Sequence, residues 1–193
     1  MSSIENLIDE KTIQERINKL ADEINHDYQD KNLVVICILK GAFYFYADLT
    51  RKLNPNTRLE FMRIKSYEGE NSTGKIDIKL DLDESIKNKD VLIIEDIIDS
   101  GNTMTFLLNY LEEKKPNSIK LCVLLDKPER RTSNIKADYV GFTIPNHFVI
   151  GYGLDLNEEY RNYPEINCIT NKNEEKNIIE KDKQLIKKQL KNH

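Results

Sequence analysis

Three carboxylates stand beside a loop whose composition suits an anion. In the stretch VLIIEDIIDSGNT, Glu95, Asp96 and Asp99 flank the small polar run at residues 100–103. Hydroxyls and backbone N–H groups at the start of a helix favour a phosphate, whereas carboxylates repel one. A ligand that needs both would place a phosphate at the loop and sugar hydroxyls at the carboxylates, with a divalent cation bridging the rest. These residue types therefore indicate a site for phosphate, ribose and magnesium.

This stretch has two other interpretations. An Asp-Ser-Gly-Asn-Thr run alone is an ordinary turn and helix cap. Two adjacent acids after a buried strand are harder to explain as scaffold, because they leave unpaired charge at a strand end without structural benefit. The loop lacks the G-x-x-x-x-G-K-[ST] spacing, so a nucleotide triphosphate site of the Walker type is not expected.

Alternating strand and helix signals predict the scaffold that positions these groups. Apolar or alternating runs predict strands at 33–39, 75–82, 91–94, 119–126, 139–144 and 148–155. Helical spacing predicts helices at 12–24, 42–53 and 103–111, the first with a capping box at Thr12 and Glu15. Buried strands separated by helices imply an α/β fold with a doubly wound, mostly parallel sheet. Ligands of such sheets lie beyond the carboxyl ends of the strands, where residues 91–94 would deliver Glu95 and Asp96.

Length and composition restrict the possible partners. The chain of 193 residues is expected to form one domain at residues 1–170, followed by a lysine-rich segment at 171–193. A net charge of −4 argues against nucleic acid and membrane surfaces as partners. No signal-peptide pattern and no apolar run near the ~20 residues of a membrane span are seen. Cys37, Cys122 and Cys168 lie in separate apolar runs, as buried thiols of a reducing compartment would, so a cytoplasmic location is expected.

The segment from Asn171 onward differs from the rest of the chain. It contains seven lysines, four acids and neither Gly nor Pro. Its apolar residues recur at roughly helical spacing and predict a solvated helix with one docking stripe: Ile178, Ile179, Leu185, Ile186 and Leu190. A disordered tail and a helix for a specific partner are the alternatives.

Five segments carry a resemblance to a known family. VLIIEDIIDSGNT resembles the phosphoribosyl-pyrophosphate motif of the type I phosphoribosyltransferases. Four more segments resemble the hypoxanthine-guanine branch of that family, in its order: LKGAFYF (39–45), KSYEGENSTG (65–74), LLDKPERR (124–131) and IPNHFVIGYGLDLNEEYRNYPEI (144–166). The last two are more specific to 6-oxopurine enzymes than the acid-pair motif is. The similarity ends near residue 170, so truncation after Asn171 is expected to leave turnover within a few-fold.

The resemblance implies a fold and a reaction. The fold would be that of the type I phosphoribosyltransferases, with a small hood subdomain. The reaction would transfer the 5-phosphoribosyl group of 5-phosphoribosyl 1-pyrophosphate (PRPP) to hypoxanthine or guanine, with Mg²⁺ as cofactor, in a homodimer or homotetramer. A xanthine- or guanine-preferring enzyme is one alternative. A regulator that keeps the fold but binds nucleotide or RNA is another, and it would need an added DNA-binding domain or a strongly basic surface.

The resemblance also implies roles on the phosphoribosyl side of the site. Asp99 would be the general base that takes the proton from the purine N7. Glu95 and Asp96 would hold the ribose hydroxyls. The 5'-phosphate would lie on Asp99, Ser100, Gly101, Asn102 and Thr103, and the pyrophosphate on Lys40, Gly41 and Arg161. In the family the peptide before this lysine can be cis, which the sequence alone does not reveal.

On the purine side, the implied residues come from the later segments. Lys127 would donate to the 6-oxo group, Phe148 would stack on the ring, and Val149 would supply backbone contacts. Asp155 would complete the purine site and would join Glu95 and Asp96 as the metal ligands. A lid would carry Ser66 and Tyr67. His147 departs from the pattern, because relatives usually carry lysine or arginine there.

Overall fold

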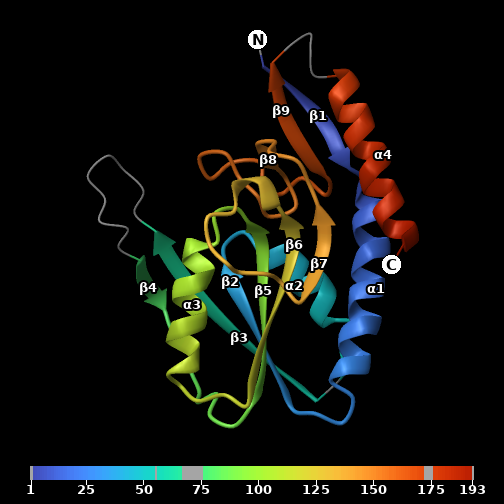
Figure 1. The fold of residues 1–193 in the computed structure, drawn as a ribbon. Helices are drawn as coiled ribbons and strands as arrows, with labels where there is room; N and C mark the ends of the chain where they lie inside the picture. The colour runs from blue at the N-terminus through green and yellow to red at the C-terminus, as the bar shows by residue number, and fades with distance from the viewer. Residues whose placement is uncertain (1, 55, 67–75, 172–175, 193) are drawn as a thin grey trace.

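Six strands form the main sheet of the computed structural model, which describes residues 2–54, 56–66, 76–171 and 176–192 (Figure 1). The strand order is β4-β3-β2-β5-β6-β7, and every neighbouring pair is parallel except the antiparallel β3–β4 pair. The strands are β2 (Leu33–Leu39), β3 (Thr57–Ser66), β4 (Ile76–Leu80), β5 (Asp90–Ile98), β6 (Ser118–Asp126) and β7 (Tyr139–Thr143). The predicted mostly parallel sheet is confirmed.

Helices cover both faces of this sheet. The helices α1 (Glu10–Asp27) and α2 (Phe43–Thr50) pack in one apolar cluster with Val35 and Cys37 of β2. The helix α3 (Asn102–Glu112) packs in a second cluster with Val34 and Ile36 of the same strand. Because successive side chains of a strand point to opposite faces, β2 is buried on both sides, as its continuous apolar run predicts.

A smaller sheet lies above the carboxyl ends of β5, β6 and β7 (Figure 1). It consists of β1 (Ser2–Ile8), β9 (Ile166–Asn171) and β8 (Val149–Ile150) in the antiparallel order β1-β9-β8. We call this sheet the hood. A single-turn 3-10 helix, Pro128–Arg130, follows β6. The hood therefore lies opposite the loops that follow the carboxyl ends of the main-sheet strands.

The helix α4 (Lys176–Asn192) runs beside β1 and also contacts β7. Ile179 and Ile186 are buried, whereas Leu185 is 55% exposed, so Leu185 does not belong to the docking stripe. Leu185 lies six positions after Ile179, which turns its side chain by about 120° from that of Ile179 on a helix with 3.6 residues per turn. The division of the chain near residue 170 stays a prediction.

Three local predictions were wrong. Asp9, not Thr12, caps α1, because the Thr12 amide donates to Asp9 Oδ1 at 2.8 Å. The strand at 91–94 runs on to Ile98, so Glu95 and Asp96 lie within β5. The run at 148–155 is a strand only at Val149–Ile150, because Gly151, Tyr152 and Gly153 adopt φ values of 94°, 49° and 103°, outside the strand region.

The cysteines lie where they were predicted. Cys37, Cys122 and Cys168 are buried in β2, β6 and β9, and none of the three forms a disulfide bond. Among the described residues, no helix has the length and apolar character needed to cross a bilayer.

Candidate functional site

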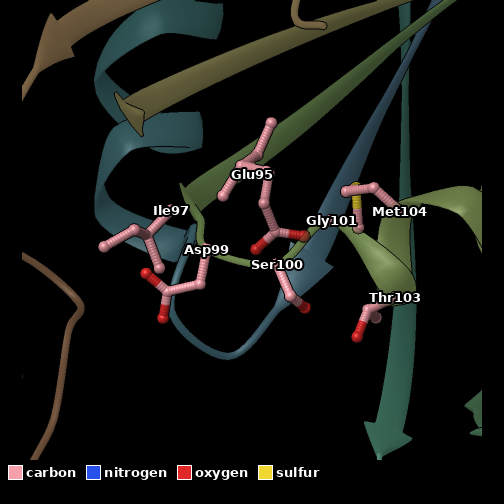
Figure 2. A pocket seen from close by; sticks show the side chains of 8 residues that line it. Glu95, Ile97, Asp99, Ser100, Gly101, Thr103 and Met104 are labelled. Carbon is pink, nitrogen blue, oxygen red and sulfur yellow. The ribbon is translucent and has the colours of Figure 1, made fainter. Parts of the chain in front are cut away.

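A small cavity opens where β5 gives way to α3 (Figure 2). It has a volume of about 210 Å³ and is lined by Glu95, Ile97, Ile98, Asp99, Ser100, Gly101, Thr103 and Met104. Gly101 is the N-cap of α3 and has no side chain to cap it, so the first turn of the helix leaves backbone N–H groups without partners inside the helix. Backbone N–H groups, two hydroxyls and the positive end of a helix dipole suit a phosphate. Asn102, the first residue of α3, is exposed.

Residues 131–133 form hydrogen bonds with the backbone of the loop at this cavity, a role that the sequence did not indicate. Ser100 O accepts hydrogen bonds from the amides of Thr132 and Ser133, at 3.1 and 3.2 Å, and from Ser133 Oγ at 3.0 Å. Arg131 Nε donates to Asp99 O at 3.0 Å. A Cβ on Gly101 would lie 2.2 Å from Ser133 Oγ, and its φ of +83° is a glycine conformation. Arg131, the second arginine of the segment LLDKPERR, was the residue from which the sequence could have indicated this support.

A second cavity of about 380 Å³ adjoins the first. Its lining comes from the end of β5, the segment after β6, and the hood: Asp96, Ile97, Asp99, Lys127, Arg130, Asn146, His147, Phe148, Val149, Leu154 and Asp155. Asp99 and Ile97 line both cavities. Phe148 is 52% exposed, so its ring is available to a ligand.

Lys127 and Asp99 form the polar centre of the second cavity. Lys127 is only 4% exposed, and its Nζ lies 3.5 Å from Asp99 Oδ1. Burial lowers the pKa of Lys127, and the Asp99 carboxylate partly opposes that shift. Asp99 Oδ1 is buried and has no hydrogen-bond partner among the described residues. A buried oxygen without a hydrogen bond is costly, which indicates that a ligand group completes it.

The two adjacent acids occupy different surroundings. Glu95 is buried, and its burial, together with the neighbouring Asp96 carboxylate, raises its pKa well above the usual range. Asp96 is half-buried and approaches Gly41 so closely that a Cβ there would lie 1.6 Å from Asp96 Oδ2. The peptide between Leu39 and Lys40 is cis. The segment after β2 therefore packs its backbone directly against the Asp96 side chain.

The loop after β8 reaches the same segment from the other side. A Cβ on Gly153 would lie 1.9 Å from Gly41 O, and the φ of Gly153 is +103°. Arg161 Nη1 donates to Gly153 O at 2.7 Å, and its Nη2 pairs with Asp155 Oδ1 at 2.8 Å. Arg161 Nε is buried without a hydrogen bond to any described residue. Lys40, Gly41 and Arg161 thus surround one region beside Asp96.

Glu158 joins the two cations of this region, and sequence reasoning did not single it out. Its Oε2 lies 2.9 Å from Lys40 Nζ and 3.1 Å from Arg161 Nη2, and these contacts lower the pKa of Glu158. Asn157, Glu158 and Tyr160 have φ values of 53°, 69° and 70°. Such conformations are costly for residues with side chains and concentrate at functional sites.

Comparison with known proteins places this geometry in a family. The model of the phosphoribosyl transferase domain matches residues 3–157. The chain is 45% identical over 164 residues to the hypoxanthine-guanine phosphoribosyltransferase of Bacillus subtilis, covering 84% of this chain and 91% of that protein. This chain belongs to the hypoxanthine-guanine phosphoribosyltransferase family.

Other relatives agree with this placement. A crystal structure of a hypoxanthine phosphoribosyltransferase from Staphylococcus aureus superposes with a TM-score of 0.83 at 45% identity, covering 86% of this chain and 91% of that one. The bifunctional protein TilS/HprT of Listeria monocytogenes is 45% identical over 164 residues. This chain spans about a quarter of the length of that bifunctional relative. The expected type I phosphoribosyltransferase fold is confirmed.

Some residues that the hypoxanthine-guanine phosphoribosyltransferase resemblance implied are not gathered at the two cavities. Ser66 ends β3, and Tyr67 lies outside the described residues. Among the described residues, no three carboxylate, histidine or cysteine groups form a ready metal cluster. Asp155 pairs with Arg161 but lines the same cavity as Asp96. Mg²⁺ commonly takes only one or two protein carboxylates together with phosphates and waters, so this donor set suits it.

Proposed function

We propose that this protein is a purine salvage enzyme that transfers the 5-phosphoribosyl group of PRPP to hypoxanthine or guanine. The products are IMP or GMP and pyrophosphate. The observation that carries the proposal is the position of Asp99, which lines both an anion-binding cavity and a cavity with an aromatic and a buried lysine. A group there contacts both substrates where they must react.

The second cavity accepts the base. A 6-oxopurine presents O6 and N7 next to one another on one edge. Lys127 donates to O6 while Asp99 takes the proton from N7, and Phe148 stacks on the ring beside the backbone of Val149. Proton transfer by a positioned side chain contributes typically ~10²–10⁴ in rate. The short separation of Lys127 and Asp99 supports this assignment.

The first cavity and the acid pair accept the phosphoribosyl group. The 5'-phosphate lies on the loop formed by Asp99, Ser100, Gly101, Asn102 and Thr103, and Glu95 and Asp96 hold the ribose hydroxyls. The purine nitrogen forms its bond to C1 as the bond from C1 to the pyrophosphate oxygen breaks. Negative charge then grows on the leaving pyrophosphate.

Lys40, Arg161 and the backbone at Gly41 face that leaving group. Positive groups placed where charge develops are a large source of catalysis. Their gathering beside Asp96 supports this assignment. The lid at Ser66 and Tyr67 is proposed to exclude water from the reacting centre.

Mg²⁺ is the proposed cofactor. Glu95, Asp96 and Asp155 supply hard carboxylate oxygens, of which Asp96 and Asp155 line one cavity. A bound magnesium ion would neutralise charge on the pyrophosphate and orient it.

A homodimer or homotetramer in the cytoplasm is also part of the proposal. The support for assembly is an apolar face on α2 and β3, where large side chains are exposed by 39–48%: Phe43, Tyr44, Leu59 and Phe61. Exposed apolar patches mark interaction sites. Sedimentation velocity of the wild-type protein checks the assembly, and a monomer would contradict it.

One assay tests the reaction. The protein is incubated with PRPP and Mg²⁺ and, separately, with hypoxanthine, guanine, xanthine or adenine, and nucleotide formation is measured. Turnover of hypoxanthine or guanine is expected. A clear preference for xanthine would favour the alternative of a xanthine-preferring enzyme. Binding of nucleotide without turnover of any base would favour a regulator and would refute the proposal.

A further inference from the structure

We infer that Asp182, on the helix α4, is a positioning residue for the base cavity and acts through His147. The inference rests on the proposed function, because the cavity concerned is the one assigned to the purine. The family model ends at residue 157, so α4 lies outside it.

The contact itself is direct and sheltered. His147 Nε2 lies 2.8 Å from Asp182 Oδ2, and the two side chains are 19% and 10% exposed. A carboxylate removed from water in this way depends on its hydrogen-bond partner. Because the histidine lines the 380 Å³ cavity, the contact joins α4 to the wall of that cavity.

The helix is anchored on both sides of Asp182, which gives the carboxylate a fixed place. Ile179 and Ile186 are buried one turn before and after it. Gln189 exchanges two hydrogen bonds with the backbone of Thr143 in β7, at 3.0 and 2.9 Å. Lys19 of α1 donates to Leu190 O. These contacts fix the position of α4, so Asp182 can hold the His147 imidazole in one place.

The segment that receives this support is the one that meets the base. Residues 144–148 connect β7 to β8, and His147 directly precedes Phe148, which is exposed on the cavity side of the connection. The Phe148 carbonyl accepts a hydrogen bond from the Ile169 amide at 3.0 Å, which ties this residue to β9. The histidine side chain supplies the second tie, to α4. Fixing the imidazole orders the backbone beside Phe148 and Val149, so the effect falls on binding of the base.

Kinetics of three variants test this inference. Asp182→Ala is expected to raise KM for hypoxanthine by about 5- to 10-fold, because a buried hydrogen-bond partner is lost. Its kcat and its KM for PRPP should stay within about 2-fold, since no catalytic group is touched. Asp182→Asn keeps an acceptor for the imidazole and should restore most of the affinity. Gln189→Ala removes two hydrogen bonds of the same helix but not the histidine contact, and should leave all three constants within about 2-fold.

The outcomes separate positioning from scaffolding. Equal rises of KM in Asp182→Ala and Gln189→Ala would show that α4 acts only as scaffold, and an unchanged KM in Asp182→Ala would show no role; either overturns the inference. If Asp182→Ala does not fold, His147→Ala carries the test and should raise KM for hypoxanthine alone. A double variant that folds should add nothing further to that rise. Failure of the proposed function would appear differently, as absence of oxopurine turnover in the wild-type protein.

Discussion

The ammonium group of Lys127 lies 3.5 Å from Asp99 Oδ1, and both residues line the cavity assigned to the base. A donor and an acceptor are thus held side by side on one wall. An ammonium has donors only, so it pairs with a carbonyl oxygen and not with the 6-amino group of adenine. This pair is the basis of the proposed selectivity.

The first prediction concerns that selectivity. The wild-type protein should show a kcat/KM for hypoxanthine or guanine at least ~10³ above that for adenine, because sites built around such a hydrogen bond reject the mismatched base strongly. Lys127→Ala should lose most activity on oxopurines and narrow the gap. Lys136→Ala, at an exposed lysine of the following segment, serves as control. Comparable wild-type rates on adenine and hypoxanthine would remove the assignment of Lys127.

The second prediction concerns Asp99 as general base. Asp99→Ala and Asp99→Asn should each lower kcat by ~10² or more, because the proton on N7 loses its acceptor. The KM for PRPP should change little, since the hydroxyls and N–H groups that donate to the phosphate belong to Ser100 to Thr103 and not to the Asp99 carboxylate. Steady-state kinetics with both substrates varied provides the measurement. A kcat near that of the wild type would exclude the base role.

The third prediction concerns Glu158, which holds Lys40 and Arg161 in the absence of substrate. The carboxylate competes with pyrophosphate for both cations, so Glu158→Gln should lower the KM for PRPP. Exposed ion pairs are weak, and the expected change is about 2- to 5-fold. Glu159→Gln, at the exposed neighbouring position, should leave the KM unchanged. A raised KM in Glu158→Gln would show instead that Glu158 orders the cations for the substrate.

The fourth prediction concerns the pH dependence of stability without ligand or metal. Burial and the Asp96 carboxylate raise the pKa of Glu95 in the folded protein, whereas the unfolded chain ionises at the ordinary value. Between those two values the folded state binds more protons, so this group lowers stability as pH rises through that window. Glu95→Gln cannot ionise. It should raise Tm at pH 8 by about 2 °C or more, and the difference should vanish near pH 4. Thermal unfolding at both pH values checks this, and equal shifts at both would contradict it.

The sequence predicted strands best where both of their faces are buried. β2 matched its predicted bounds, because a continuous apolar run has one simple explanation. The strand predicted for β5 ended at Ile94, because the charged residues Glu95 and Asp96 are typical of the end of a strand. In the structure both residues lie within β5, which continues to Ile98. β3 was not predicted. Its Leu59 and Phe61 are exposed whereas Glu60 between them is buried, so the order of apolar and polar residues does not follow burial in this strand.

The site was predicted to different depths for a similar reason. Lys127 and Asp99 could be named because each lies in a recognisable segment next to a strand. The contacts of Glu158 with Lys40 and of Asp182 with His147 join residues 118 and 35 positions apart. Such pairs depend on how the hood and α4 sit on the main sheet, which local spacing does not encode.

The pairing of β1 with β9 has a consequence for the order in which the protein assembles. Every residue of the phosphate loop and its support lies between residues 90 and 133, so that half of the site needs only nearby chain. The hood side of the base cavity depends on β8, which pairs with β9, and β9 pairs in turn with residues 2–8. During synthesis, the earliest strand must wait for the ribosome to deliver residue 171 before the hood can close. A nascent chain halted before β9 would carry its phosphate loop but no enclosed place for a purine.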